Sequence, residues 1–260
     1  MSGAQYEVYA IKYAHHERRA SENFIGGDPH DGPMPLDYFV WLVRGKERQI
    51  VVDTGFSKAV ALRRQREHLR CPSEGLALLG ADSRKIEDVV ITHLHYDHVG
   101  NFDLFPAATF HLQDREMQYA TGRHMAQPVF SGAFDVEDVV GMVRNTYAGR
   151  VRFHDGDAEI APGVSLHFIG GHTMGLHVVR VATRRGHVVL ASDASHFYAN
   201  MEQVRPVPIV FNVAQMVEGY ARLRALADSP AHIIPGHDPL VLERYPAPAA
   251  GLQGIAARLD

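Results

Sequence analysis

The sequence predicts a mixed α/β fold, with one domain spanning residues 1–260. Short runs of β-branched and other apolar residues recur along the chain, such as Val89-Val90-Ile91 and Ile233-Ile234, and each has the length of a buried strand. The segment 214–227 instead repeats its apolar residues at helical spacing, which predicts an amphipathic helix. No linker or low-complexity segment divides the chain, and 260 residues is an ordinary length for a single α/β domain.

The first half of the chain alternates strand and helix patterns, interrupted by one long polar segment. Residues 14–35 are rich in Gly, Pro and His and have no clear period, so we expect a loop that is either a lid over a site or a plain surface excursion. The predicted strands are 6–13, 37–43, 49–52, 89–91 and 108–112. The predicted helices are 57–70, 72–80, 114–119 and 136–147.

Two segments of this half leave alternatives open. The helical segment 57–70 carries several arginines, and we expect them on a solvated face rather than beside an acidic substrate. The segment 121–134 is expected to be irregular, and its Met125, Phe130 and Phe134 belong to the core or complete a substrate pocket.

A second strand-rich half is expected to begin near residue 150. Its predicted strands are 151–154, 164–169, 177–182, 188–191 and 233–234. The helix 214–227 precedes the last strand, and the Pro-rich tail is expected to end in a weak helix.

Composition limits the partners and the compartment. The formal net charge of −4 gives no reason to expect a nucleic acid partner, and the 17 histidines point to metal or proton chemistry. No run approaches the ~20 apolar residues of a membrane span, and the N-terminal segment 1–7 does not resemble a secretory signal. The single cysteine, Cys71, cannot form an internal disulfide, which fits a reducing compartment, so we expect a cytoplasmic protein. Because no apolar span is found, we expect no membrane partner.

Three histidines and an aspartate lie within six positions directly after the apolar run 89–91. On an extended stretch His93 and His95 point to the same side, whereas Asp97 and His98 follow where the chain is expected to turn. This geometry predicts two neighbouring metal ions, with His93 and His95 on the first and Asp97 and His98 on the second. Imidazole and carboxylate ligands without thiolate favour two Zn²⁺ ions, with Mn, Fe or Co as alternatives.

The stretch from His93 to His98 resembles the HxHxDH motif of the metallo-β-lactamase fold superfamily. The resemblance extends over about residues 37–240 and implies a four-layer αββα sandwich. Asp53-Thr54-Gly55 is similar to the family's DTG turn, whose aspartate supports the metal site, although a plain strand-terminal turn has the same residues.

The same resemblance implies three further metal ligands. Residues 170–177 resemble the GHTxGH motif, whose first histidine, here His172, joins His93 and His95. Asp193 matches the aspartate that bridges the two ions, and His237 matches the last ligand of the second ion.

Within the superfamily the chain is most similar to the N-acyl-homoserine lactone lactonases, on residues 82–90 and Asp193-Ala194-Ser195. Those quorum-quenching enzymes have a tyrosine three residues after the bridging aspartate, where this chain has His196, with Tyr198 two residues further on. The resemblance implies a dinuclear zinc hydrolase that opens a lactone ring by attack of a metal-bridging hydroxide. Its catalytic residues are expected to be Asp97, Asp193, His196 and Tyr198.

Other functions are compatible with the same ligands. The alternatives are hydrolysis of a cyclic amide, thioester, β-lactam or other ester, a mono-iron persulfide dioxygenase-type redox enzyme, and a non-catalytic metal-binding module. The expected partner is a small-molecule lactone or related acyl compound, and the expected assembly is a monomer or homodimer.

Overall fold

The computed structural model describes residues 4–260. The segment 1–7, which is not expected to be a secretory signal, therefore lies partly outside the described residues. The strands form two sheets. The first has the order β13-β1-β2-β3-β5-β6-β7, with β4 paired to β1, and the second has the order β12-β11-β10-β9-β8. The strands of the first sheet are β1 Glu7–His16, β2 Leu36–Arg44, β3 Gln49–Val52, β4 Glu67–His68, β5 Asp88–Val90, β6 Thr109–Gln113, β7 Val151–His154 and β13 Ala256–Arg258. Those of the second are β8 Ala158–Ala161, β9 Val164–Phe168, β10 His177–Thr183, β11 Gly186–Ser192 and β12 Ile233–Pro235.

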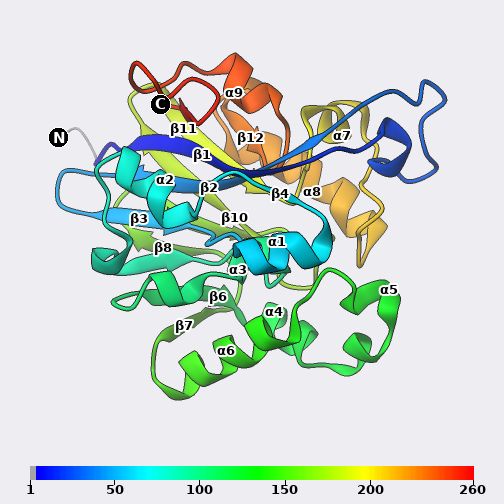
Figure 1. The fold of residues 1–260 in the computed structure, drawn as a ribbon, viewed down its shortest axis with the longest axis horizontal. Helices are drawn as coiled ribbons and strands as arrows, with labels where there is room; N and C mark the ends of the chain where they lie inside the picture. Colours follow the sequence, from blue (N-terminus) through cyan, green and yellow to red (C-terminus); the bar gives the residue numbers. More distant parts are fainter. Residues whose placement is uncertain (1–3) are drawn as a thin grey trace.

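Helices cover the outer face of each sheet (Figure 1). They are α1 Lys58–Arg64, α2 Pro72–Leu78, α3 Tyr96–Val99, α4 Asp114–Ala120, α5 Pro128–Ser131, α6 Val136–Tyr147, α7 Tyr198–Gln203, α8 Val213–Leu226 and α9 Leu240–Arg244. Short 3₁₀ turns lie at Ala20–Glu22, Ser83–Lys85, Phe102–Leu104, Arg123–Ala126 and Pro230–His232.

Strand β2 shows why the fold has layers. Its residues are buried except for the partly exposed Arg44, and successive side chains point to opposite faces. Phe39, Trp41 and Val43 point toward the second sheet and belong to a core cluster that contains buried residues of its strands and of α8. Tyr38, Val40 and Leu42 pack on the other side, in a core shared with α1, α2 and α6. The predicted four-layer αββα sandwich is therefore confirmed.

Several predicted elements need correction. The helix predicted at 57–70 ends at Arg64, because Gln65 adopts a left-handed conformation (φ 57°) and the chain then forms β4 beside β1. The loop predicted to begin at residue 14 begins later, since β1 continues to His16 in its pairing with β2 and β4. Strand β8 and the short helices α5, α7 and α9 were not predicted.

The division into two halves is also wrong at its boundaries. The strand at 151–154 was assigned to the second half, but β7 pairs in parallel with β6 at the edge of the first sheet. The tail predicted to end in a weak helix instead returns to the first sheet as β13, antiparallel to β1. Strand pairing over this distance along the chain overrides the weak local preference of Ala256-Ala257.

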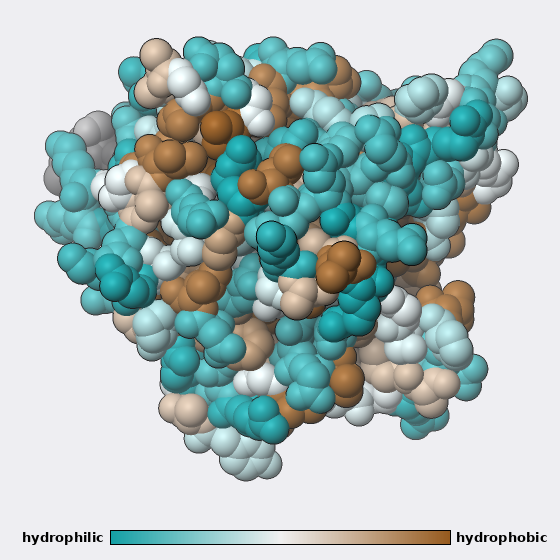
Figure 2. All heavy atoms as spheres, in the orientation of Figure 1, coloured by the Kyte–Doolittle hydropathy of each residue, from teal (hydrophilic) through white to brown (hydrophobic). Residues whose placement is uncertain are grey.

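The surface is predominantly hydrophilic on the face drawn in Figure 2, with apolar residues in scattered groups. Among the helices of residues 4–260, none has the length and apolar character needed to cross a membrane.

His177, at the start of β10, is fully buried, and neither ring nitrogen has a hydrogen-bond partner within residues 4–260. Burial, followed by the charges of His154 and His111, lowers the pKa of His177 to about 3 from 6.5. Below pH 6.5 the unfolded chain therefore binds a proton here that the folded chain does not, so stability falls as the pH drops toward 3. At pH 5 this costs about 2 kcal/mol, and the cost becomes negligible above about pH 7.5.

We therefore expect His177→Leu to weaken the pH dependence of stability. Between pH 7.5 and 5.0, chelator-treated wild-type protein should lose about 2 kcal/mol more unfolding free energy than the variant. Urea titrations at both pH values measure this difference, and equal losses in the two proteins would contradict the prediction.

Candidate metal centre

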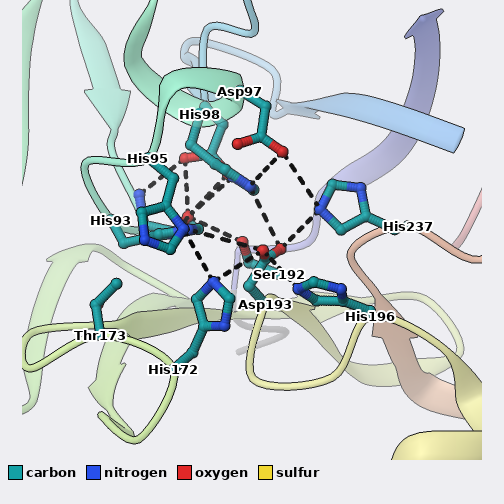
Figure 3. Close-up of polar contacts among 12 residues, drawn as sticks. His93, His95, Asp97, His98, His172, Thr173, Ser192, Asp193, His196 and His237 are labelled. Carbon is teal, nitrogen blue, oxygen red and sulfur yellow. Dashed lines mark hydrogen bonds and ion pairs between the residues drawn. The ribbon is translucent and has the colours of Figure 1, made fainter. Parts of the chain in front are cut away.

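Buried donor side chains converge at the carboxyl ends of strands from both sheets (Figure 3). His93 and His95 follow β5, and Asp97 and His98 lie in α3, the turn of helix that comes next. From the second sheet, His172 lies between β9 and β10, Asp193 directly follows β11, and His237 follows β12. The C-terminal ends of parallel strands are where α/β folds place their sites, because the loops there are free to aim side chains.

The first group of donors consists of three imidazoles and one carboxylate oxygen. His95 Nδ1 lies 3.0 Å from His93 Nε2 and 3.0 Å from His172 Nε2. Asp193 Oδ2 lies 3.1 Å from His172 Nε2 and 3.7 Å from His93 Nε2. These four residues can hold one metal ion together.

The second group lies on the other side of Asp193. His98 Nε2 is 3.6 Å from Asp97 Oδ2, and His237 Nε2 is 3.7 Å from the same oxygen. Asp193 Oδ1 lies 3.0 Å from His237 Nε2 and 3.4 Å from His98 Nε2. Asp193 thus turns one carboxylate oxygen to each group of histidines.

The backbone around Asp193 is strained and tightly packed. Ser192 has a φ of 45°, a left-handed conformation that is costly for a residue with a side chain. Gly236 passes so close that a methyl group on it would lie 2.7 Å from Asp193 Oδ1. Strain of this kind is kept where the surroundings require one position of a side chain, and here that side chain is Asp193.

The donor set fits metal cations. Among the described residues, His98 Nε2 and Asp193 Oδ1 are buried without a hydrogen bond of good geometry, which is costly unless a cation completes them. Burial and the neighbouring histidines lower the pKa of His93 and His95 well below the usual value, so both rings are neutral and able to coordinate. Burial would raise the pKa of Asp193, but the charges of His237 and His196 hold it well below its ordinary range.

Groups behind the donors fix their orientation. The Nδ1 atom of His98 lies 2.7 Å from Asp53 Oδ2, and His237 Nδ1 donates to the backbone carbonyl of Asp37 at 2.9 Å. Each contact leaves Nε2 of the ring facing Asp193. Asp53 itself has a φ of 61° and accepts hydrogen bonds from the Thr92 backbone and hydroxyl at 2.8 and 3.0 Å.

Glu116 was not predicted from the sequence, although it connects the two segments that carry the first group. This fully buried carboxylate of α4 accepts hydrogen bonds from Leu94 N at 2.9 Å, Thr173 Oγ1 at 2.6 Å and Gly175 N at 3.0 Å. Leu94 lies between His93 and His95, and Thr173 follows His172. Glu116 therefore holds the two histidine segments in register with each other.

Comparison with known sequences decides the family. The sequence model of the metallo-beta-lactamase superfamily matches residues 34–237, which include every donor described above. The chain belongs to the metallo-β-lactamase superfamily. In this metallo-β-lactamase domain, the two groups of histidines on either side of Asp193 come from the matched region.

Individual relatives are more distant. The N-acyl homoserine lactonase AttM of Azorhizobium caulinodans is 28% identical over 181 residues, which is 67% of this chain and 66% of that protein. The N-acyl homoserine lactonase AiiB of Agrobacterium fabrum is 32% identical over 136 residues, covering 49% of this chain and 47% of that protein. The chain thus matches less than two thirds of the length of either relative.

The fold is shared with a solved quorum-quenching N-acyl homoserine lactone lactonase. The TM-score is 0.75 at 22% identity, and the superposition covers 91% of this chain and 93% of the other.

The two candidates beyond Asp193 occupy different places in this metallo-β-lactamase domain. The two groups of metal-ligand candidates and the Asp193 between them are called the donor cluster below. His196 lies beside this cluster, with Nε2 at 2.9 Å from Asp193 Oδ2 and its ring between those of His172 and His237. Tyr198 begins α7 and is buried in the core cluster of the second sheet, where Arg244 of α9 stacks on its ring. The structure therefore brings His196 to the site and does not bring Tyr198 there.

A cavity of about 230 Å³ opens onto the donor cluster. The segment 121–134 does contribute to it, but through Val129, Gly132 and Ala133, while Phe134 is buried in the core of the first sheet. The long segment before β2 contributes Arg18. In Figure 1 this segment and α5 both project at the right edge of the molecule.

Proposed function

We propose that the chain is a dinuclear metal-dependent hydrolase, with zinc as its metal, that opens the ring of a lactone. The observation that carries the proposal is the position of Asp193, whose Oδ2 faces His172 at 3.1 Å and whose Oδ1 faces His237 at 3.0 Å. Such a carboxylate can bind one cation on each side, and its negative charge offsets the repulsion between them. The similarity to lactonases supports the choice of substrate.

The chemistry needs no nucleophile from the protein. Two zinc ions in these sites would lower the pKa of a coordinated water toward neutrality and polarise the carbonyl of the substrate. His93, His95 and His172 would hold one ion, Asp97, His98 and His237 the other, and Asp193 both. In the reaction the water oxygen ends on the carbonyl carbon, the ring C–O bond breaks, and a proton is delivered to the leaving ring oxygen.

We assign the delivery of this proton to His196. Its Nε2 faces the donor cluster, and the residue lines the cavity. Burial lowers the pKa of His196 to about 4, so the ring is neutral near pH 7. It would take up the proton released by the attacking water and pass it to the leaving alkoxide.

Metal content and bond specificity test the proposal together. Purified protein should contain about two zinc ions per chain and release protons from lactones in a pH-indicator screen that also includes thioesters, cyclic amides and β-lactams. One iron per chain, with oxygen consumption and no hydrolysis, would instead favour a persulfide dioxygenase. Hydrolysis of another bond class alone would overturn the choice of lactone.

The variant His196→Phe tests whether His196, rather than Tyr198, delivers the proton. We expect about a hundredfold lower kcat with both metals retained, because only the proton donor is lost. Tyr198→Phe is the matched control and should keep wild-type kcat, since the Tyr198 hydroxyl has no hydrogen-bond partner in the described part of the chain. Equal kinetics for His196→Phe and wild type would contradict the assignment.

A further inference from the structure

Arginines form one wall of the cavity over the donor cluster. Three of them line it and are called the arginine wall below: Arg18, Arg64 and Arg66. Arg18 follows β1, Arg64 ends α1, and Arg66 precedes β4. The expectation that the arginines of segment 57–70 lie on a solvated face is therefore wrong for two of them.

The guanidinium of Arg64 is bound by groups of the protein itself. Its Nη1 donates to the carbonyl of Gly132 at 3.0 Å and its Nη2 to that of Phe134 at 2.8 Å. The guanidinium lies 3.9 Å from the ring centroid of Tyr96, a cation–π distance. Arg64 thus fixes the segment that closes one side of the cavity.

Arg66 and Arg18 are less well neutralised. Arg66 donates to the Tyr96 hydroxyl at 3.3 Å and to the Arg64 carbonyl at 2.7 Å, and it forms no ion pair with a carboxylate of residues 4–260. Arg18 donates to the backbone carbonyl of Glu22 at 2.5 Å, and its one carboxylate partner within the described residues is that of Glu22, at 3.8 Å and half exposed. Burial, and next the charges of Arg66 and Arg18, lower the pKa of nearby His16 to about 4, consistent with excess positive charge at this wall.

This excess charge is costly without a counterion. Arg66 and Arg18 are partly buried, and a desolvated guanidinium lacking a carboxylate is unfavourable. A planar fork of N–H donors matches the geometry of a carboxylate, so a ligand that carries one would supply the missing charge.

The wall lies a short distance from the donor cluster. The hydroxyls of Tyr38 and Tyr96 are 3.3 Å apart, and the Tyr38 ring lies 5.2 Å from that of His237. Arg66 contacts Tyr96, so two tyrosines connect it to a proposed metal ligand. A cavity of about 230 Å³ is also smaller than the ~300–1,000 Å³ common for drug-sized ligands.

We propose that the substrate is a compact molecule with a carboxylate group that Arg66 and Arg18 bind, while the bond to be hydrolysed lies at the donor cluster. This inference rests on the proposed hydrolase function and specifies its substrate class. A small carboxylated lactone satisfies it, whereas a lactone with a long neutral acyl chain leaves Arg66 without a counterion and Arg18 with the half-exposed Glu22 alone.

Kinetics with a matched pair of lactones test the proposal. γ-Butyrolactone with a ring carboxylate should be hydrolysed with a kcat/KM about a hundredfold above that of its neutral carboxamide. In Arg66→Met this ratio should fall to near one, chiefly through a higher KM for the carboxylate, and Arg66→Lys should recover part of it. Arg63→Met is the matched control, because Arg63 lies only three residues before Arg66, in the last turn of α1, pairs with Asp135 and does not line this cavity. A wild-type ratio near one would overturn the proposal.

A binding measurement separates this proposal from the hydrolase function. Calorimetry with tetrahydrofuran carboxylate, which has no bond to hydrolyse, should give an affinity for metal-free wild type that drops about 10- to 100-fold in Arg66→Met and stays constant in Arg63→Met. If this binding pattern is observed but the enzyme hydrolyses no lactone, the carboxylate site is supported and the lactonase function is rejected. Absence of binding, or equal binding to wild type and Arg66→Met, would reject the carboxylate site itself.

Discussion

Replacing Asp193 by asparagine is expected to lower kcat/KM at least about a thousandfold, equivalent to about 4 kcal/mol of transition-state stabilisation. The reason is that the two oxygens of Asp193 face different histidine groups, so an amide offers an oxygen to only one of them. The neutral amide also removes the negative charge between two cations. Bound zinc should fall from about two ions to about one per chain, as measured by elemental analysis.

Asp228→Asn provides the control for this result. Asp228 also pairs with a histidine, His187, but on the surface of the second sheet and away from the donor cluster. It should keep wild-type metal content and activity. An Asp193→Asn enzyme with two bound metals and unchanged kcat/KM would show that Asp193 is not the bridging ligand.

The residues of the candidate metal centre could be predicted because the HxHxDH motif follows an apolar run, and because His172, Asp193 and His237 match family motifs at the ends of further apolar runs. His93 and His95 have the two-residue spacing of an extended segment, and Asp193 and His237 follow short buried strands. Tyr198 was predicted because its hydroxyl could replace that of the lactonase tyrosine, although it lies two residues beyond His196. The start of α7 at Tyr198 turns its side chain into the core, and nothing in the local sequence indicated that turn.

Groups that act through distant partners could not be predicted. Arg66 is one of several arginines in its segment, and only the folded chain shows that it lines the cavity while Arg63 pairs with Asp135. The strands β4 and β13 are similar cases, because each is short and forms by pairing with β1. Helix α6 was predicted with its observed bounds, since its apolar spacing is local.

Replacing Glu116 by alanine is expected to lower the free energy of unfolding by about 3–5 kcal/mol. The substitution leaves three buried donors without their acceptor, namely Leu94 N, Thr173 Oγ1 and Gly175 N. These donors belong to the segments of His95 and His172, so zinc affinity should also fall about 10- to 100-fold. Urea unfolding of the metal-free protein and competition with a zinc chelator measure the two effects separately.

Two further variants decide whether Glu116 positions the metal ligands or only supports the core. Asp114→Ala removes another acidic residue from the first turn of α4 and should cost less than about 1 kcal/mol, with unchanged zinc affinity. Glu116→Gln keeps the size and one acceptor oxygen, so it should fold stably enough for metal binding to be measured. If Glu116→Gln binds zinc like the wild type, the carboxylate stabilises the fold without orienting the histidines. If the folded variant loses zinc affinity, the second carboxylate oxygen, which accepts from Thr173 and Gly175, holds His172 in place.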